Sequence, residues 1–352
     1  YSASAVDTYG LKNNLSIGSV GIMGCSRAGN FVVQNADLIL VFGSRLNSMT
    51  VGECGHFARK AKVIVIDIDE IEHSKSTLHI DRLIKADLKR TLKLLINENL
   101  KNTNKDWLKK CLHWKNIFPK NENTYVADEK VNLYFLAECL SNVMPERSTL
   151  LTDSGLIELI LPTNISFGEH QKCIHPVSQG SMGAALPSLI GAHFASSEPV
   201  IAVIGDGSIM MNLQEFETIR HNKIPAKIFI INNNAYAVIR KRQVEMFRNR
   251  TIGTGPSDGV SCPNFEKVAA TFGLTYVNIN SNNDLEQKLK SVLNIDGPVL
   301  CEIIGLENQN YISTSHAKDQ KGRIVTRPIE DQSPFLDRKL FVSEMIVDPI
   351  NQ

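Results

Sequence analysis

The chain has 352 residues, 43% of them hydrophobic, and a formal net charge of +1. This length predicts two domains, and the hydrophobic share is ample for two buried cores. The near-zero charge argues against binding to nucleic acid or a membrane surface, and the apolar runs are too short to span a bilayer. Seven cysteines without Cys-x-x-Cys spacing indicate neither a disulfide framework nor a zinc site, so a reducing cytoplasm is expected. The chain starts at Tyr1 without a signal peptide, which predicts that upstream sequence is missing.

Two apolar runs in the first third, 36–43 and 61–69, have the length and composition of buried strands and are separated by a helical length. They predict a Rossmann-like α/β arrangement. Gly18, Gly21 and Gly24 lie upstream of both runs with the spacing Gly-x-x-Gly-x-x-Gly. The dinucleotide fingerprint needs Gly-x-Gly-x-x-Gly between a strand and a helix, so a nicotinamide dehydrogenase is not favoured.

The middle of the chain contains the predicted domain boundary. Residues 97–128 are rich in Lys, Asn and Glu with two Trp in a helical pattern, which predicts a surface helix followed by a linker. We therefore divide the chain into a first domain, 1–123, and a second, 124–352. The second domain is expected to open with a helix over 130–143 and a strand over 149–153, and then to alternate strands and helices around a mainly parallel sheet.

Two polar clusters in the second domain each follow a predicted buried strand. The sequence Gly-Asp-Gly-Ser at 205–208 follows the apolar run 200–204, and Asn-Asn-Asn at 232–234 follows the run 227–231. Because the carboxyl ends of parallel strands meet at the same edge of a sheet, the two clusters are expected to lie close together.

The residue types in these clusters suit a diphosphate and a magnesium ion. Gly205 and Gly207 allow a tight turn and a close approach to phosphate oxygens. Magnesium takes hard oxygen ligands, several of them from substrate phosphates and water. We interpret the carboxylate of Asp206, the side-chain amide of Asn233 and the backbone carbonyl of Ala235 as its protein ligands. One cluster alone would be typical of an ordinary strand-to-helix turn, and it is the pairing that favours a site.

The paired clusters resemble the thiamine diphosphate signature. A second motif at 179–187 is similar to the Gly-x-Met-Gly-x-x-Leu-Pro run of the acetolactate synthase family. This resemblance implies that Met182 lies under the cofactor and holds its bent conformation, although Met182 by itself would be typical of a core residue. The cofactor-binding residues that it implies are Ser181, Met182, Gly205, Asp206, Gly207, Ser208, Asn233 and Tyr236.

Two further segments resemble thiamine-enzyme relatives encoded with surface-polysaccharide genes. They are 232–240, which matches Asn-Asn-Asn-Gly-Tyr-x-x-Ile-Arg, and the C-terminal motif 328–336, which matches Pro-Leu-Glu-Asp-Met-x-Pro-Phe-Leu. The first match places Ala235 where these relatives have Gly. Alanine is tolerated there only if its φ is negative.

The same resemblance implies that the first domain is the second half of a Rossmann-like central domain. It implies that the N-terminal domain, which binds the cofactor's pyrimidine, is absent. Arg45, Asp67 and Asp69 match positions that line a flavin site in the family, so FAD stays an alternative. The stretch 45–49, however, lacks both acids and the second Arg of the family's Arg-Phe-Asp-Asp-Arg, which argues against a flavin.

Other departures concern the second domain. The family's Gly-Gln-His-Gln-Met-Trp run is replaced over 155–159, which removes two polar contacts near the diphosphate. Arg242 stands where the family has the Trp that shapes the acceptor pocket, so the second substrate is expected to differ. Five basic residues follow the second polar cluster, and we call them the basic cluster: Arg240, Lys241, Arg242, Arg248 and Arg250. The basic cluster is either a solvated helix face or a site for an anionic acceptor such as a sugar nucleotide.

The function implied by the resemblance is thiamine diphosphate- and Mg²⁺-dependent decarboxylation of a 2-keto acid, pyruvate, with carboligation to an acceptor carbonyl. The proton-handling Glu of the family lies on the pyrimidine domain, so no catalytic residue is assigned and this chain alone is expected to be inactive. A homodimer or homotetramer is expected. The alternatives are a simple 2-keto acid decarboxylase and a noncatalytic diphosphate-binding subunit that needs a partner chain.

Overall fold

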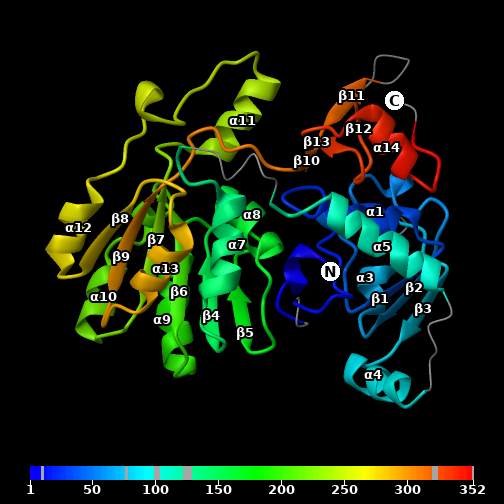
Figure 1. Ribbon diagram of the computed structural model, residues 1–352, viewed down its shortest axis with the longest axis horizontal. Coiled ribbons are helices and arrows are strands. Elements are labelled where there is room, and N and C mark those ends of the chain that lie inside the picture. Colours follow the sequence, from blue (N-terminus) through cyan, green and yellow to red (C-terminus); the bar gives the residue numbers. More distant parts are fainter. Residues whose placement is uncertain (9–11, 76–77, 99–103, 122–128, 319–323, 351–352) are drawn as a thin grey trace. The chain divides into compact units, whose positions relative to one another are not determined.

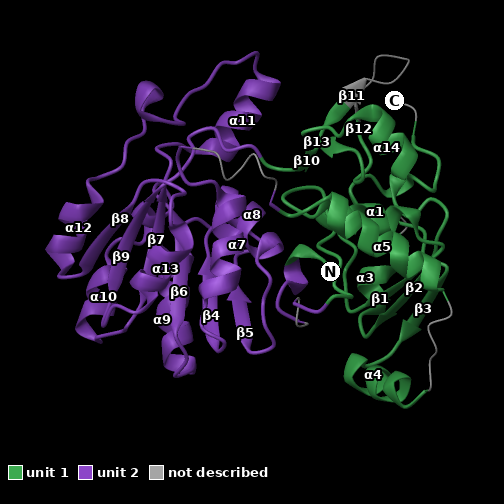
Figure 2. Cartoon of the chain, viewed as in Figure 1, with its two compact units in different colours: residues 1–3, 14–120, 311–352 green, residues 4–13, 121–310 purple. Residues whose placement is uncertain are grey.

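The computed structural model describes residues 1–8, 12–75, 78–98, 104–121, 129–318 and 324–350 (Figure 1). The chain forms two compact units, coloured separately in Figure 2. Unit 1 comprises residues 1–3, 14–120 and 311–352, and unit 2 comprises residues 4–13 and 121–310. The chain leaves unit 1 close to the boundary expected at residue 123. The C-terminal segment then folds with unit 1, whereas the sequence interpretation assigned it to the second domain.

Unit 1 is built on a parallel sheet of three strands in the order β1-β2-β3. The first two strands are the apolar runs expected at 36–43 and 61–69, and Leu38 pairs with Lys62 at the start of their register. The strands are β1 (Leu38–Phe42), β2 (Lys62–Asp67) and β3 (Arg82–Lys85), and the helices are α1 (Arg27–Asn35), α2 (Ser48–Val51), α3 (Glu70–His73), α4 (Leu88–Asn97), α5 (Lys105–Ile117) and α14 (Arg338–Glu344).

The helix expected from the two tryptophans is α5, and one of its faces is buried. Trp114 is 0% exposed and its ring lies 5.9 Å from that of Phe31 on α1. Its indole N–H donates to Glu344 Oε2 of α14 at 3.0 Å. The expected surface helix is therefore amphipathic, because Trp114 packs in the core of unit 1 while Lys105 and Lys109 are exposed. Part of the linker expected after it, 122–128, lies outside the described residues.

The C-terminal motif holds its segment on α1. Glu330 forms an ion pair with Arg59 at 2.8 Å and accepts a hydrogen bond from Gln34 Nε2 at 2.6 Å. Gln332 Oε1 accepts one from Asn30 Nδ2 at 2.9 Å. These polar residues of the motif are buried, and their hydrogen bonds hold the C-terminal segment against the rest of unit 1. Two short antiparallel pairs belong to the same segment, β10 (Ser313–Thr314) with β13 (Gln332–Ser333) and β11 (His316–Lys318) with β12 (Ile324–Thr326).

Unit 2 contains a parallel sheet of six strands in the order β5-β4-β6-β7-β9-β8. Helix α7 contacts α8 and α13 on one face, and α10 contacts α9 and α12 on the other (Figure 1). The prediction of an α/β fold with a mainly parallel sheet and helices on both faces is confirmed. The strands are β4 (Ser148–Thr152), β5 (Gln171–Ile174), β6 (Val200–Gly205), β7 (Lys227–Asn232), β8 (Thr275–Ile279) and β9 (Val299–Ile304), and the helices are α7 (Leu133–Val143), α8 (Leu156–Asn164), α9 (Ala185–Ala195), α10 (Glu215–His221), α11 (Ala237–Met246), α12 (Phe265–Phe272) and α13 (Leu285–Leu293).

The inner strands β6 and β7 fix where the two polar clusters lie. Both are runs of apolar, mostly β-branched residues and both are buried along almost their whole length, as expected for a parallel sheet covered on two faces. Gly205 at the end of β6 pairs with Ile231 near the end of β7. The segments that follow these strands therefore leave the sheet side by side.

Among the described residues, no helix is both long enough and apolar enough to cross a bilayer.

Candidate active site

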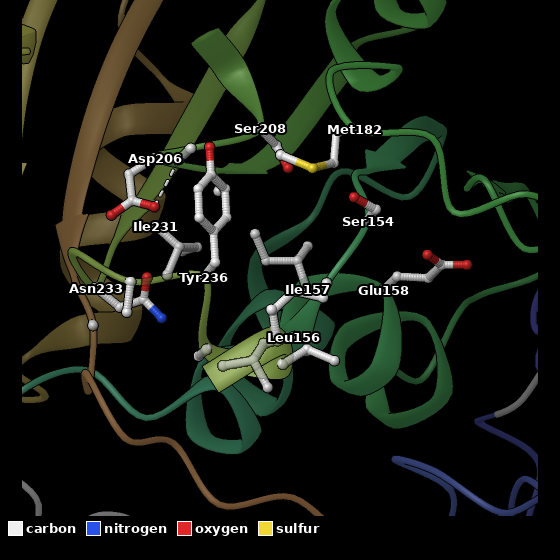
Figure 3. Close-up of a pocket in the computed structure, with 18 of the residues that line it drawn as sticks. Ser154, Leu156, Ile157, Glu158, Met182, Asp206, Ser208, Ile231, Asn233 and Tyr236 are labelled. Atoms are coloured by element: carbon white, nitrogen blue, oxygen red, sulfur yellow. Dashed lines mark hydrogen bonds between the residues drawn. The ribbon is translucent and has the colours of Figure 1, made fainter. Parts of the chain in front are cut away.

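A cavity of about 280 Å³ lies in unit 2 beyond the carboxyl ends of β4, β6 and β7 (Figure 3). The strand order changes direction here, because β5 lies on one side of β4 while β6 and β7 lie on the other. In open α/β sheets such a switch point is where ligands bind. Ser181 is exposed and does not line the cavity. The site residues expected from the sequence that do line it are Met182, Gly205, Asp206, Gly207, Ser208, Asn233, Ala235 and Tyr236.

Asp206 connects the ends of β6 and β7. Its carboxylate accepts hydrogen bonds from the backbone N–H of Gly207 at 2.7 Å and of Asn234 at 2.6 Å, one on each oxygen. Its own N–H donates to the carbonyl of Ile231 at 3.1 Å. The side chain is 3% exposed, and this burial raises the pKa of Asp206 although the two N–H donors act against it. Each carboxylate oxygen keeps lone pairs that a cation can use.

The loop after β7 takes its left-handed turn at Asn234. Asn234 has φ +55°, a conformation that asparagine adopts more readily than most residues, while Ala235 has no positive φ. The condition for alanine at this position is therefore met. Asn233, on the same wall of the cavity as Asp206 and Tyr236, presents its side-chain amide there (Figure 3).

The donor set fits a magnesium ion shared with phosphate oxygens. Asp206, Asn233 and Ala235 together offer a carboxylate, an amide and a carbonyl oxygen beside one cavity. Within the described parts of the chain, no group of three or more His, Cys, Asp or Glu side chains could enclose a metal. A cation bound at Asp206 would need further oxygens from phosphate and water, which is how Mg²⁺ is usually held.

The start of α8 faces the cavity from the opposite wall. Gly155, with φ +88°, precedes the helix, and no side chain caps its first turn. The wall is made by Gly155, Leu156, Ile157 and Glu158. The first backbone N–H groups of a helix lack intrahelical partners and attract anions. Residues 155–159 lack the polar side chains of the family's run, and backbone N–H groups are the donors that remain at this wall. The side-chain pattern of the sequence does not predict these backbone donors.

A buried carboxylate at the end of β4 holds the segment that carries Met182. Asp153 is 0% exposed and accepts hydrogen bonds from the N–H groups of Ser154, Gly183 and Ala185, each at 2.9 Å. Gly183, with φ +81°, lies directly after Met182. Met182 thereby reaches the cavity wall with 39% of its surface exposed. The sequence analysis does not assign this role to Asp153. Its position directly after a buried strand, like that of Asp206, is the feature that could have indicated a functional residue.

Tyr236 and Gly207 are in direct contact. A Cβ atom on Gly207 would lie 2.3 Å from Tyr236 Cε1, which is shorter than real contacts allow. The backbone N–H of Tyr236 donates to the carbonyl of Thr254 at 2.9 Å, which fixes the backbone here, so the ring would have to rotate about its side-chain bonds to admit a Cβ at 207. Glycine at 207 therefore leaves room for the Tyr236 ring in its present position as well as access for a ligand.

We expect Gly207→Ala to displace the Tyr236 ring and to lower the free energy of unfolding by about 1–3 kcal/mol, the usual cost of overpacking. Gly205→Ala is the matched control, because the nearest atom to its new Cβ is Ile157 Cδ1 at 3.6 Å, an ordinary contact. Urea denaturation of both variants measures the difference. A G207A protein as stable as G205A would contradict this contact, and the double variant G207A/Y236A should recover most of the loss.

The basic cluster does not line the cavity. Arg240 pairs with Glu307 at 2.5 Å and donates to the carbonyl of Thr254 at 3.2 Å. Arg242 lies 3.6 Å from Glu245 on the exposed face of α11. The Arg242 side chain is 41% exposed, which favours the solvated-face interpretation for this residue, whereas the Arg240 side chain is 16% exposed and paired within unit 2.

The acids expected near a flavin have partners inside their own loop of unit 1. Asp67 Oδ2 lies 3.1 Å from His73 Nε2, and Asp67 Oδ1 accepts a hydrogen bond from the N–H of Asp69 at 3.0 Å. Asp69 caps α3 by accepting one from the N–H of Glu72 at 3.0 Å. Arg45 is exposed.

Comparison with protein families matches two models to this chain. Residues 153–303 match the C-terminal TPP binding domain of thiamine pyrophosphate enzymes, and residues 3–95 match their central domain. The chain belongs to the thiamine pyrophosphate enzyme family. The TPP-binding match begins at Asp153 and contains every position at which the sequence predicted thiamine diphosphate or metal contacts. The cavity of this thiamine pyrophosphate enzyme is therefore formed chiefly by its TPP-binding domain.

Individual relatives of this thiamine pyrophosphate enzyme are acetolactate synthases. The large subunit from Porphyra purpurea is 30% identical over 307 residues, which is 84% of this chain and 50% of that protein. The large subunit from Cyanidium caldarium is 29% identical over 308 residues, 85% of this chain and 51% of that protein. The isozyme 2 large subunit from Escherichia coli (strain K12) is 29% identical over 295 residues, which is 82% of this chain and 51% of that protein. The chain thus spans about half the length of these relatives.

Proposed function

We propose that this chain holds the diphosphate and Mg²⁺ of thiamine diphosphate in an enzyme that decarboxylates a 2-keto acid, pyruvate, and joins the remaining carbons to an acceptor carbonyl. The observation that carries the proposal is Asp206. It is a buried carboxylate at a switch point that is bonded to the loop of Asn233 and lies across the cavity from the uncapped start of α8. The acetolactate synthase relatives support the choice of reaction.

The residues of this chain would divide the work of holding the cofactor. Asp206, Asn233 and the carbonyl of Ala235 would bind the metal, and the backbone around Gly207 and Ser208 would approach the diphosphate. Met182 would contact the ring region as a polarizable apolar side chain. When bound, thiamine diphosphate supplies a thiazolium ring that accepts the electron pair released as carbon dioxide leaves the 2-keto acid. The Glu that handles the pyrimidine proton would come from a part of the enzyme that this chain does not contain.

Apolar side chains near the cavity support a larger assembly. Met182 and Ile239 line the cavity and are exposed, and Met211, which a Cβ on Gly183 would meet, is exposed as well. Clustered exposed apolar groups commonly mark an interface. We therefore propose that another domain of a homodimer or homotetramer covers this face and completes the site.

A product assay tests the reaction. The enzyme made from its complete reading frame, given pyruvate, Mg²⁺ and thiamine diphosphate, is expected to release carbon dioxide and form a carbon–carbon product with added keto acids or keto-sugar nucleotides. Acetaldehyde as the sole product would indicate the simple decarboxylase. Binding of thiamine diphosphate without turnover of any 2-keto acid would indicate a noncatalytic subunit.

A further inference from the structure

The cavity wall carries two charged side chains, and both are acidic. Asp206 and Glu158 line it, and none of its described lining residues is Lys, Arg or His. They lie at opposite ends. Figure 3 shows Asp206 beside Asn233, while Glu158 lies across the cavity on the side of Ser154 and Met182. An anion placed here would therefore face two carboxylates with no side-chain cation between them.

A metal ion can compensate only one of these carboxylates. Asp206 belongs to the proposed Mg²⁺ ligands, whereas the carboxyl of Glu158 is directed to the Gly180 turn, with Oε2 3.8 Å from the position of a Cβ on Gly180. A unit negative charge in a poorly solvated site that also holds a polyanion is costly unless it is paired or neutralised. None of the described lining residues is a cation that can pair with Glu158, so within this chain it is a proton that neutralises it.

The surroundings of Glu158 favour its neutral form even before a ligand binds. Burial raises the pKa of Glu158 to about 7, and the charge of Asp153 acts in the same direction. The elements packed on α8 are α7, β4 and β6. Neither β4 nor β6 carries a charged side chain, and on α7 Glu138 is exposed and accepts a hydrogen bond from Asn121 instead. The Gly180–Met182 turn has no titratable side chain.

We propose that Glu158 carries a proton when the cofactor is bound, so that binding of the anionic cofactor is coupled to uptake of one proton at the Met182 end of the cavity. The inference rests on the proposed function, because it takes thiamine diphosphate with Mg²⁺ as the anion. Glu158 becomes a neutral hydrogen-bond donor in the occupied site, and it limits binding at alkaline pH.

The sign of the pH dependence follows from this coupling. Below pH 7 the free protein already holds the proton, so Glu158 adds no pH dependence. Above pH 7 the protein must take up the proton in order to bind, and the apparent affinity falls in proportion to the protonated fraction. The loss is roughly tenfold per pH unit until the higher pKa of the occupied state is reached.

Calorimetric titration of the enzyme made from its complete reading frame with thiamine diphosphate and Mg²⁺, from pH 6 to 9, tests the proposal. Titrations in two buffers of different ionisation enthalpy give the number of protons taken up. Glu158→Gln keeps the shape and cannot titrate, and Glu169→Gln removes an exposed carboxylate beyond α8 as the matched control. We expect wild type and E169Q to take up close to one proton more than E158Q at pH 8.5. The affinity of E158Q should fall less with pH, and the proton equilibria of the cofactor itself cancel in the comparison.

Two results would overturn the inference, and they are distinguishable. Equal proton uptake and parallel pH profiles in wild type and E158Q, with tight binding in both, would show that Glu158 does not take up the proton. The proposed function would be unaffected by that result. Failure of both proteins to bind thiamine diphosphate at any pH, with folding verified by circular dichroism, would overturn the proposed function and this inference with it.

Discussion

Replacement of Asp206 by Ala is expected to lower the affinity for thiamine diphosphate with Mg²⁺ by more than about 100-fold, because outer-shell partners of metal ligands alone are worth roughly 10- to 100-fold. The carboxylate would be the one charged protein ligand of the metal. It also holds the N–H of Asn234, at 2.6 Å, and so positions the loop that carries Asn233. Both effects weaken binding in the same direction.

Three comparisons make the Asp206 result specific. Glu217→Gln removes a half-exposed carboxylate of unit 2 that pairs with Arg220 on α10, and its binding should match that of wild type. Asp206→Asn retains an oxygen acceptor and the shape of the side chain, so it should bind better than D206A and worse than wild type. Isothermal titration with Mg²⁺ and with EDTA gives the affinities. An unchanged Mg²⁺-dependent affinity in D206A would defeat the site assignment.

Replacement of Asp153 by Asn is expected to lower the free energy of unfolding by about 1–3 kcal/mol, the cost of leaving one buried donor without its partner. The amide has one oxygen, so its NH₂ group would face either the N–H of Ala185 or those of Ser154 and Gly183. The segment that presents Met182 should loosen, and cofactor affinity should fall with it.

Denaturation midpoints and amide hydrogen exchange measure the Asp153 effect. Faster exchange is expected in peptides that cover 180–186, with little change in unit 1. Asp337→Asn is the matched control, since Asp337 caps α14 by accepting a hydrogen bond from the N–H of Leu340 at 3.0 Å and asparagine caps helices equally well. A D153N protein with wild-type exchange over 180–186 would show that Asp153 does not anchor this segment.

The parts of the site that could be predicted from the sequence depend on local patterns. The runs at 200–204 and 227–231 are short, mostly apolar and rich in β-branched residues, and this pattern predicts buried parallel strands. One topological rule then places Asp206 beside Asn233. The strands and helices of both units follow the same kind of pattern, and Asp206 and Asn233 do line one cavity in the structure.

The remaining features depend on contacts between distant residues, which no local pattern encodes. The C-terminal segment joins unit 1 through pairs such as Asn30 with Gln332, which are 302 positions apart in the chain. The role of Asp153 depends on Gly183 and Ala185, about thirty positions further along. Ser181 is part of a matched motif, yet its side chain does not line the cavity. A motif identifies a segment, and the backbone path decides which of its side chains face the ligand.

We infer that Asp206, Asn233 and Ala235 hold a cation together with a diphosphate. Crystals of the enzyme made from its complete reading frame, grown with thiamine diphosphate and Mn²⁺ in place of Mg²⁺, test this inference, because anomalous scattering locates Mn²⁺. We expect one peak within about 2.0–2.4 Å of a carboxylate oxygen of Asp206, the amide oxygen of Asn233, the carbonyl oxygen of Ala235 and two diphosphate oxygens. A diphosphate bound elsewhere, or in this cavity with a cation that does not touch Asp206, would contradict it.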